Sequence, residues 1–334
     1  MSEGPEVKLT AENICRSICG QTIDKVYCKP SIGKEFANKI IGSTVKQVET
    51  YGKNIVIAFS TGIYLRNHML MWGKWRIYDT QEFEQGKSKA PQQNTLKRMI
   101  SITSKHTPDD PVTKKNGYAN DVRNRSAIDV RNDLRVRLML FTKDKVAVQF
   151  NGPILKFSFE NPANLKPIAK LGPDPLRYDF DINDLKNRLH QRMNDNSTGL
   201  IADLLLDQTL VAGIGNKYKS EILFLSKINP FVTVKDIPSK VMKTLLQQIP
   251  SVLRIGYMNA GMTRAVHKTI GGMANSNNKK WSDKHWVFRR GGRPCWKCMT
   301  QIVTDYKSSA RVTFWCPKCQ ASVPDAISNS IFTS

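Results

Sequence analysis

The sequence lacks any apolar run close to the ~18 residues that a membrane-spanning helix needs. Its first ten residues contain no basic segment followed by an apolar run, so we expect no secretory signal peptide. Acidic residues are also scarce, because 28 Asp and Glu stand against 51 Lys and Arg, which gives a formal charge of +23. We therefore expect a protein without a membrane partner that is not secreted: cytoplasmic or in the nucleoid of a prokaryote, nuclear in a eukaryote.

Cysteine is rare outside the C-terminal region, and Cys15, Cys19 and Cys28 show no disulfide-like pattern. The other four cysteines form two CxxC pairs on either side of residues 299–315, namely Cys295, Cys298, Cys316 and Cys319. This spacing is typical of a zinc ribbon, in which two tight turns direct four thiolates at one ion. The alternatives are four free thiols or two disulfides. We predict that these four residues bind one structural Zn²⁺.

The excess positive charge accompanies an ordinary apolar content of 40%. A chain of 334 residues with this content can bury real cores, so a disordered cationic tail is excluded. A strongly basic folded protein most often binds a polyanion, usually nucleic acid. One alternative is a basic surface that serves only solubility. The other is attraction of the protein to a membrane surface.

Periodicity predicts an amphipathic helix over residues 5–19 and then short strands over 22–27, 44–50, 54–60, 63–67, 75–78, 134–141 and 145–150. Strands of this length and number favour an antiparallel sandwich or barrel. Apolar and basic residues alternate from Leu134 to Leu138, which predicts one buried and one solvent-exposed face. Residues 81–133 are polar and basic, and we expect most of them to form a mobile, solvated insertion between two strands. A loop that helps to hold DNA is the alternative.

From Asp181 the period becomes helical, with helices expected over residues 182–193, 198–210, 216–226 and 239–249 and a loop over 269–280. The predicted fold class is α+β: an N-terminal antiparallel β-sandwich with a leading helix, a C-terminal helical domain, and a zinc-ribbon β-hairpin. The predicted domains are residues 1–160, 161–284 and 285–322, followed by a tail over 323–334.

Two short segments carry chemistry. Gly213 and Gly215 allow a tight turn before a helix that begins at Asn216. The first backbone N–H groups of this helix have no partner within it, so they favour a phosphate. Lys217 and Lys219 are nearby. An ordinary helix hairpin is the alternative. At the other end of the chain, removal of Met1 would leave the α-amine of Ser2, with an ordinary pKa of about 7.7–8.0, beside the carboxylate of Glu3. A frayed start is the alternative there.

The segments Ser2–Glu6, Tyr51–Asn54, His68–Gly73, Leu171–Pro175 and Leu204–Glu221, followed by the cysteine ribbon, occur in one order. In that order the sequence resembles the formamidopyrimidine-DNA glycosylase/endonuclease VIII family, and more closely its endonuclease VIII branch. The resemblance covers nearly the whole chain outside residues 81–133 and the tail. It implies that residues 161–284 form a helix–two-turn–helix DNA-binding domain.

The resemblance also implies an activity: a bifunctional base-excision-repair DNA glycosylase and AP lyase that removes oxidised bases, preferentially pyrimidines, by Schiff-base chemistry and β,δ-elimination. The partner would be damaged DNA, duplex or single-stranded, bound by a monomer without a redox cofactor. The implied catalytic residues are Ser2 (through its α-amine), Glu3, Lys53 and Arg311. The implied DNA contacts are His68, Leu70, Met71, Trp72, Asn216, Lys217 and Arg311, with Met71 filling the gap left by the extruded nucleotide. Supporting acidic residues would be Glu6, Asp174 and Asp207.

The chain departs from the family at position 2, where most members have proline and this sequence has serine. A primary amine still forms an imine, but the imine must gain a proton to become the cationic electrophile. Two other classes stay open: a catalytically silent lesion-binding module, and a zinc-ribbon transcription or replication factor. The second leaves the N-terminal matches and the helical turn unexplained.

Overall fold

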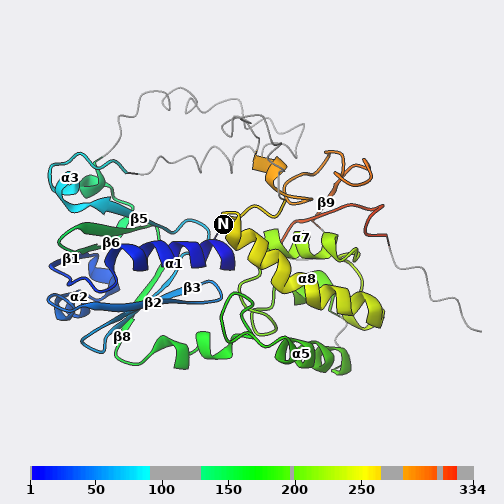
Figure 1. Ribbon diagram of the computed structural model, residues 1–334, viewed down its shortest axis with the longest axis horizontal. Coiled ribbons are helices and arrows are strands. Elements are labelled where there is room, and N and C mark those ends of the chain that lie inside the picture. Colours follow the sequence, from blue (N-terminus) through cyan, green and yellow to red (C-terminus); the bar gives the residue numbers. More distant parts are fainter. Residues whose placement is uncertain (1, 91–128, 196–198, 265–280, 307–310, 322–334) are drawn as a thin grey trace, which may run out of the picture.

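The computed structural model describes residues 2–90, 129–195, 199–264, 281–306 and 311–321. The predicted loop at 269–280 and tail at 323–334 lie outside these ranges, as does most of the insertion at 81–133. The chain forms two lobes that lie side by side, an N-terminal β lobe and a C-terminal helical lobe (Figure 1). Among the described residues, no helix combines the length and the hydrophobicity that crossing a membrane requires.

The N-terminal lobe is an antiparallel sandwich of two four-stranded sheets. One sheet has the order β1 (Lys25–Cys28), β6 (Val136–Phe141), β7 (Lys145–Phe150) and β5 (Lys74–Asp79). The other has the order β2 (Val45–Tyr51), β3 (Asn54–Phe59), β4 (Tyr64–His68) and β8 (Ile154–Ser158). The predicted sandwich is confirmed. Strand β8 and the short helix α2 (Lys34–Lys39) were not predicted.

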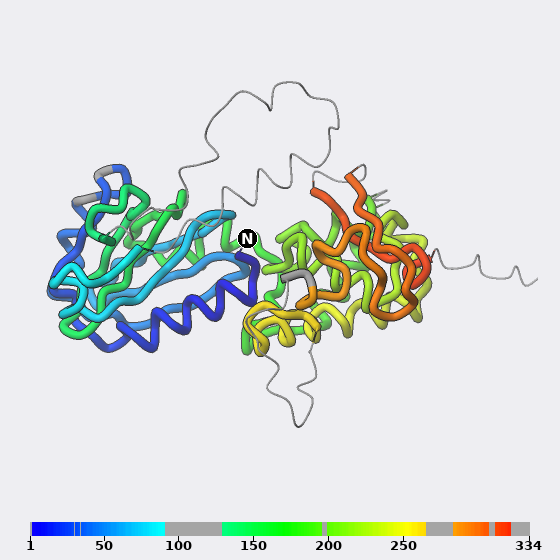
Figure 2. The backbone as a smooth tube through the Cα atoms, turned by 90° about the horizontal axis from the view of Figure 1, so that it is seen from above, coloured from blue at the N-terminus to red at the C-terminus, as the bar shows by residue number. Residues whose placement is uncertain are grey.

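Helix α1 (Gly4–Ile18) belongs to the core of this lobe. Its apolar residues Val7, Ala11, Ile14 and Ile18 recur at helical spacing, so they share one face. That face packs against both sheets, with contacts to β2, β3, β5 and β7. The N-terminal end of α1 reaches the junction between the lobes, where Figure 2 shows it from above. Residues at the start of the chain are thereby carried to the helical lobe.

Strand β6 contradicts the expectation of one buried and one exposed face. Leu138 packs in the core between the sheets, whereas Val136 packs in a second core on the outer face of the sheet. A register shift between these two residues turns them to opposite faces. Leu134, at the start of the alternating run, is 89% exposed. The sheet is therefore buried on both faces.

The outer face is covered by the two ends of the predicted insertion. Helix α3 (Thr80–Glu84) follows β5 and places Phe83 in the outer core, and Val130 enters the same core from the other end. The mobile insertion was expected over most of 81–133, and its two ends are packed on the sheet. Residues 91–128 lie outside the described ranges, so the rest stays a prediction.

The helical lobe contains α5 (Ile182–Asn194), α6 (Ile201–Leu204), α7 (Asn216–Leu225) and α8 (Ser239–Met258) around one core. Helix α6 is shorter than predicted because Asp207 and Gln208 bond the chain into a turn: Asp207 accepts from the Thr209 N–H, and Gln208 bonds the Ile214 carbonyl and the Gly213 N–H. Helix α8 is longer than predicted, since it continues past Pro250.

The last part of the chain is a small module built on the hairpin of β9 (Val303–Asp305) and β10 (Thr313–Trp315), as predicted. Its core includes Phe288 and Phe314, which pack against Phe224 of α7. The helical lobe and the module are therefore joined through α7.

Cysteine usage differs from expectation at one pair. Cys15 and Cys19, one turn apart at the C-terminal end of α1, form a disulfide, while Cys28 is free. The prediction that these three residues do not pair is wrong for Cys15 and Cys19, because helical spacing places their sulfurs on the same face.

Three glycines form the contact between the lobes. The Gly4 N–H donates to the Gly213 carbonyl at 2.8 Å, and a Cβ on Gly4 would lie 3.1 Å from the Gly213 Cα. Gly52, in the β2–β3 turn, would bring a Cβ within 3.2 Å of the Gly213 nitrogen. Backbone approach at this distance leaves no room for side chains. The start of the chain, the β2–β3 turn and the turn before α7 therefore meet at one point.

We expect Gly52→Ala to destabilise the protein by more than its backbone conformation alone explains. Gly52 has a φ of +57°, which costs an alanine roughly 1–2 kcal/mol. Its Cβ would also lie 3.1 Å from the Ala212 Cβ and 3.2 Å from the Gly213 nitrogen, and such overpacking typically costs about 1–3 kcal/mol. Urea unfolding measures the sum. Gly42→Ala is the matched control, because Gly42 has a φ of +79° and nothing within 4 Å of the added Cβ. Equal losses for the two variants would contradict the packing.

Candidate active site

The carboxylate of Glu3 lies at the N-terminal end of α7. Glu3 is 1% exposed, and its two oxygens accept hydrogen bonds from the backbone N–H groups of Gly215 (3.0 Å), Lys217 (2.9 Å) and Tyr218 (3.2 Å). The first amides of a helix have no partner within it, and the helix dipole favours negative charge there. Glu3 therefore supplies the anion that this helix end favours. The expectation that these amides bind a phosphate is wrong, because Glu3 occupies them.

Glu6 connects α1 to the same helix. Its carboxylate accepts from the Tyr218 hydroxyl at 3.0 Å and from the Glu3 backbone N–H at 3.2 Å, and it pairs with the Lys217 ammonium. Lys217 also donates to the Gly261 carbonyl at 3.1 Å and is 5% exposed. Lys217 was expected to contact DNA, but the structure directs its ammonium into the protein. Glu6 thus contacts Glu3 and α7, and the supporting role expected of it stays a prediction.

Lys53 is carried by the β2–β3 turn, which Asp174 fixes. The Asp174 carboxylate is 8% exposed and accepts from the Gly52 N–H at 2.8 Å and from the Leu176 N–H at 3.0 Å. Burial raises the pKa of Asp174, while these two backbone donors oppose the shift. Asp174 thus ties the turn to the segment between the lobes, next to Lys53.

Electrostatics place Lys53, Glu3 and Arg311 in one cluster. Burial lowers the pKa of the Lys53 ammonium to about 8; the negative charge of Glu3 opposes this shift and the positive charge of Arg311 adds to it. Arg311 is exposed and lies two residues before Thr313, where β10 begins. Glu3 at the start of the chain and Arg311 at the C-terminal hairpin therefore both act on the ammonium of Lys53, which belongs to the β lobe.

The turn between β4 and β5 carries the predicted wedge. Leu70 and Met71 are 43% and 50% exposed, and Leu70 has a φ of +49°, in the left-handed region that few side chains adopt. The His68 ring accepts from the Leu70 N–H at 3.2 Å. Burial, with Lys53 and Arg66 nearby, lowers the pKa of His68 to about 4, so this ring is neutral at pH 7. Trp72 is partly buried in the same turn.

Asn216 and Asp207 make contacts within the protein, and the roles expected of them stay predictions. Asn216 is 4% exposed and donates from its side-chain amide to the Val312 carbonyl at 2.7 Å, which ties α7 to the residue after Arg311. Asp207 pairs with Arg192 at 2.8 Å and caps its own turn through Thr209, so it shapes the turn before α7. Ser2 is partly buried beside Glu3.

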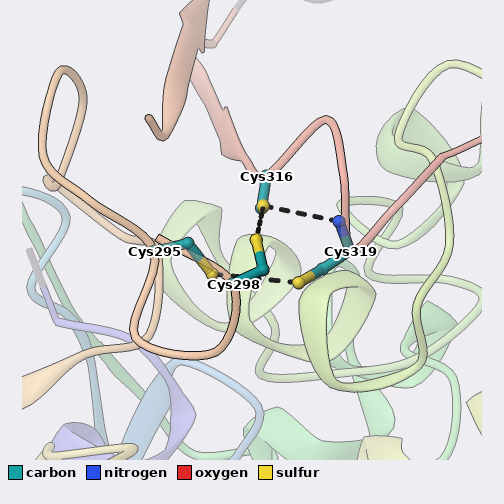
Figure 3. A group of neighbouring side chains, drawn as sticks. All are labelled: Cys295, Cys298, Cys316 and Cys319. Carbon is teal, nitrogen blue, oxygen red and sulfur yellow. Dashed lines mark hydrogen bonds between the residues drawn. The ribbon is translucent and has the colours of Figure 1, made fainter. Parts of the chain in front are cut away.

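The four C-terminal cysteines converge as the spacing predicts. Their sulfurs all lie within 4.8 Å of one another, with Cys295–Cys319 at 3.8 Å and Cys298–Cys316 at 3.4 Å (Figure 3). Four thiolates at about 2.3 Å from a tetrahedral zinc are about 3.8 Å apart, whereas a disulfide needs about 2.05 Å. The arrangement fits a zinc ion and excludes the two-disulfide alternative.

Sequence reasoning missed Glu221. It is 0% exposed, and its carboxylate accepts from the backbone N–H groups of Trp286, Val287 and Phe288, each at 2.9 Å. An acidic residue in an otherwise buried helix was the available signal, since a buried carboxylate requires hydrogen-bond donors. Glu221 anchors the C-terminal module to α7.

Two family models match the chain, that of the formamidopyrimidine-DNA glycosylase N-terminal domain over residues 1–126 and that of the formamidopyrimidine-DNA glycosylase H2TH domain over residues 171–266. Together they span more than half of the sequence. The chain belongs to the formamidopyrimidine-DNA glycosylase/endonuclease VIII family. The members of this family are base-excision-repair DNA glycosylases that also act as AP lyases, which confirms the expected class of enzyme.

Relatives within the family extend along the whole chain. Endonuclease 8 of Salmonella arizonae is 26% identical over 322 residues, which cover 96% of this chain and 100% of the relative. Endonuclease 8 of Pectobacterium carotovorum is 24% identical over 323 residues, with the same coverage. These relatives fit the predicted endonuclease VIII branch.

Solved structures confirm the fold. A complex between the Lactococcus lactis Fpg and DNA containing an abasic site matches with a TM-score of 0.67 at 21% identity, and covers 96% of this chain and 100% of that one. A complex of the same enzyme with DNA containing an oxidised pyrimidine also has a TM-score of 0.67 and 21% identity.

We expect one zinc per chain, released by Cys298→Ser. A serine hydroxyl replaces one of four thiolates, so the site loses affinity and the hairpin loses its cross-link. Native mass spectrometry of wild type and variant measures the metal. Cys28→Ser is the matched control, because Cys28 is free and belongs to the β lobe. A wild-type protein that folds without zinc, or a Cys298→Ser protein that keeps it, would contradict the site.

Proposed function

We propose that this enzyme removes oxidised bases, pyrimidines in particular, from damaged DNA and then cleaves the abasic site through an imine at the α-amine of residue 2. The observation that carries the proposal is the position of Glu3, the residue that follows the predicted nucleophile. Its carboxylate is buried against the first amides of α7, and its negative charge acts on the Lys53 ammonium. The family's activity needs an amine and an acid–base group side by side, and this chain has them adjacent.

The chemistry follows from an amine at that position. After Met1 is removed, the nitrogen of Ser2 attacks C1′ of the damaged nucleoside; the N–C1′ bond forms and the bond from C1′ to the base breaks, with the base leaving protonated. The nitrogen then gives up a proton, and its lone pair opens the sugar: the C1′–O4′ bond breaks, O4′ takes a proton to become a hydroxyl, and C1′ and the nitrogen form an iminium. This iminium makes the C2′ protons acidic. Loss of one of them expels the 3′ phosphate, and a second elimination expels the 5′ phosphate.

Glu3 serves as the proton carrier in this scheme. A carboxylate offers about four acceptor positions, and the backbone amides of α7 use three of them. The hydrogen bonds to α7 fix the carboxylate in place, as a general acid–base catalyst requires.

Lys53 and Arg311 act on the phosphates around the reacting sugar. The lowered pKa of Lys53, about 8, brings its ammonium closer to neutral pH, so it gives up a proton more readily than an ordinary lysine. Arg311, exposed at the hairpin, suits a bidentate contact to a phosphate. Asn216 supports Arg311 from behind through Val312.

Exposed apolar residues in the β4–β5 turn support extrusion of the nucleotide. Flipping a base costs a few kcal/mol and leaves a gap in the stack. Leu70 and Met71 form an exposed apolar pair beside His68, whose neutral ring adds no charge there. We assign the wedge to Met71, with Leu70 and Trp72 beside it.

The zinc ion has a structural role. Its four thiolate ligands leave no open coordination position, and bound zinc would cross-link the two turns beneath the hairpin that carries Arg311. We also propose that the enzyme acts as a monomer, in the compartment that holds the cell's DNA, and uses no redox cofactor.

Borohydride trapping on a duplex with one abasic site tests the proposal. Borohydride reduces an imine to a stable amine, so wild-type protein should form an adduct that mass mapping places on the nitrogen of residue 2. Ser2→Pro should trap faster, because a secondary amine gives the cationic iminium directly. Ser2→Gln, whose larger side chain hinders removal of Met1, should trap poorly.

Lys53→Met distinguishes the α-amine of residue 2 from the side-chain amine of Lys53 as the nucleophile. It should keep the adduct on residue 2 while slowing strand cleavage. An adduct on Lys53 in the wild-type protein would overturn the nucleophile, and the absence of any adduct with DNA binding intact would overturn the lyase activity. Excision rates for a ring-saturated thymine against a ring-opened guanine, each in duplex DNA, test the preference for pyrimidines.

A further inference from the structure

Lys219 of α7 is a buried cation that the chemistry above does not use. It is 0% exposed, and its ammonium donates to the hydroxyl of Thr313, itself 0% exposed, at 2.9 Å. Burying an ammonium group is costly, and the cost appears as a pKa lowered to about 8. The negative charges of Asp203 and Glu3 oppose this shift, and the positive charge of Arg311 adds to it. A neutral apolar side chain would pack here without that cost.

The partner of Lys219 explains its placement. Thr313 is the first residue of β10 and follows Arg311 by two positions. Asn216, one turn earlier on the same face of α7, donates to the carbonyl of Val312 at 2.7 Å. Helix α7 therefore holds the two residues that follow Arg311, while its N-terminal amides hold Glu3.

We propose that Lys219 is a positioning residue for Arg311. Its hydrogen bond to Thr313 fixes the start of β10, and its positive charge repels the Arg311 guanidinium from α7, so that the guanidinium faces the DNA phosphates beside Glu3 and Lys53. This inference rests on the proposed function, because the phosphate contact of Arg311 belongs to it.

A double-mutant cycle on the lyase step tests the proposal. Lys219→Met removes the ammonium and keeps the length of the side chain. We expect it to lower the single-turnover cleavage rate of abasic duplex by about tenfold in the wild-type background and by less than about twofold in an Arg311→Ala background. An equal loss in both backgrounds would show that the effect does not pass through Arg311, and would overturn the proposal.

Thr313→Val tests the same contact from its other partner, because valine has nearly the size and shape of threonine. It removes the acceptor from Lys219 and keeps the shape of the side chain, so it carries the test if Lys219→Met fails to fold. It should slow cleavage in the wild-type background and leave Arg311→Ala unaffected. An unchanged rate for Thr313→Val would overturn the proposal.

The control is Thr304→Val, an identical substitution on β9, where Thr304 pairs with Phe314. It should leave the cleavage rate unchanged, and a loss equal to that of Thr313→Val would assign the effect to the hairpin in general and overturn the role of Lys219. Zinc content and thermal unfolding are measured on every variant. Failure of the proposed function is distinguishable, since the wild-type protein would then form no borohydride adduct.

Discussion

The carboxylate of Glu3 on the first amides of α7 is the interaction on which the rest of the structure depends. It joins the start of the chain to a helix more than 200 residues later, across the junction between two lobes with separate cores. A hydrogen bond to a charged group contributes about 1.5–3 kcal/mol, and three buried amides would otherwise have no partner. The junction also brings Gly4, Gly52 and Gly213 into backbone contact, so no side chain separates the segments that contain them. Ser2 and Glu3, just before Gly4, and Lys53, just after Gly52, are close together for this reason.

Helix α7 organises the site because its polar residues, although buried, each bind a different part of the protein. Lys217 and Tyr218 bond Glu6, Asn216 and Lys219 bond the strand after Arg311, and Glu221 bonds the backbone that leads into the zinc module. Buried polar groups are tolerated only when they are satisfied, so each of these contacts fixes one geometry. The sequence predicted a phosphate-binding surface at this helix, but the helix is an internal scaffold. Arg311, an exposed cation, lies on the hairpin instead.

Local patterns allowed much of the fold to be predicted. The sandwich strands, α1, α5, α7 and the cysteine ribbon all followed from periodicity and spacing, because each depends on near neighbours in the chain. The predictions failed where strand pairing, side-chain hydrogen bonds or burial decided the outcome, none of which periodicity shows. The register shift in β6 turned Val136 to a second core, side chains of Asp207 and Gln208 ended α6 early, and burial of α8 carried it past Pro250. Likewise, Asn216 and Lys217 looked like surface residues, since nothing nearby in the sequence announces Glu3, Glu6 or Val312 as their partners.

Hydrogen exchange of the backbone amides of Gly215, Lys217 and Tyr218, compared between wild-type protein and Glu3→Gln, tests the central contact most directly. A glutamine offers one acceptor oxygen in place of two charged ones, so these amides lose partners. The amide of Asn183 is the internal reference, because it is capped by Asp181 within the helical lobe. The account predicts exchange at least about tenfold faster at the α7 amides in the variant, with Asn183 unchanged. Equal exchange at the α7 amides in the two proteins would mean that Glu3 does not hold the lobes together.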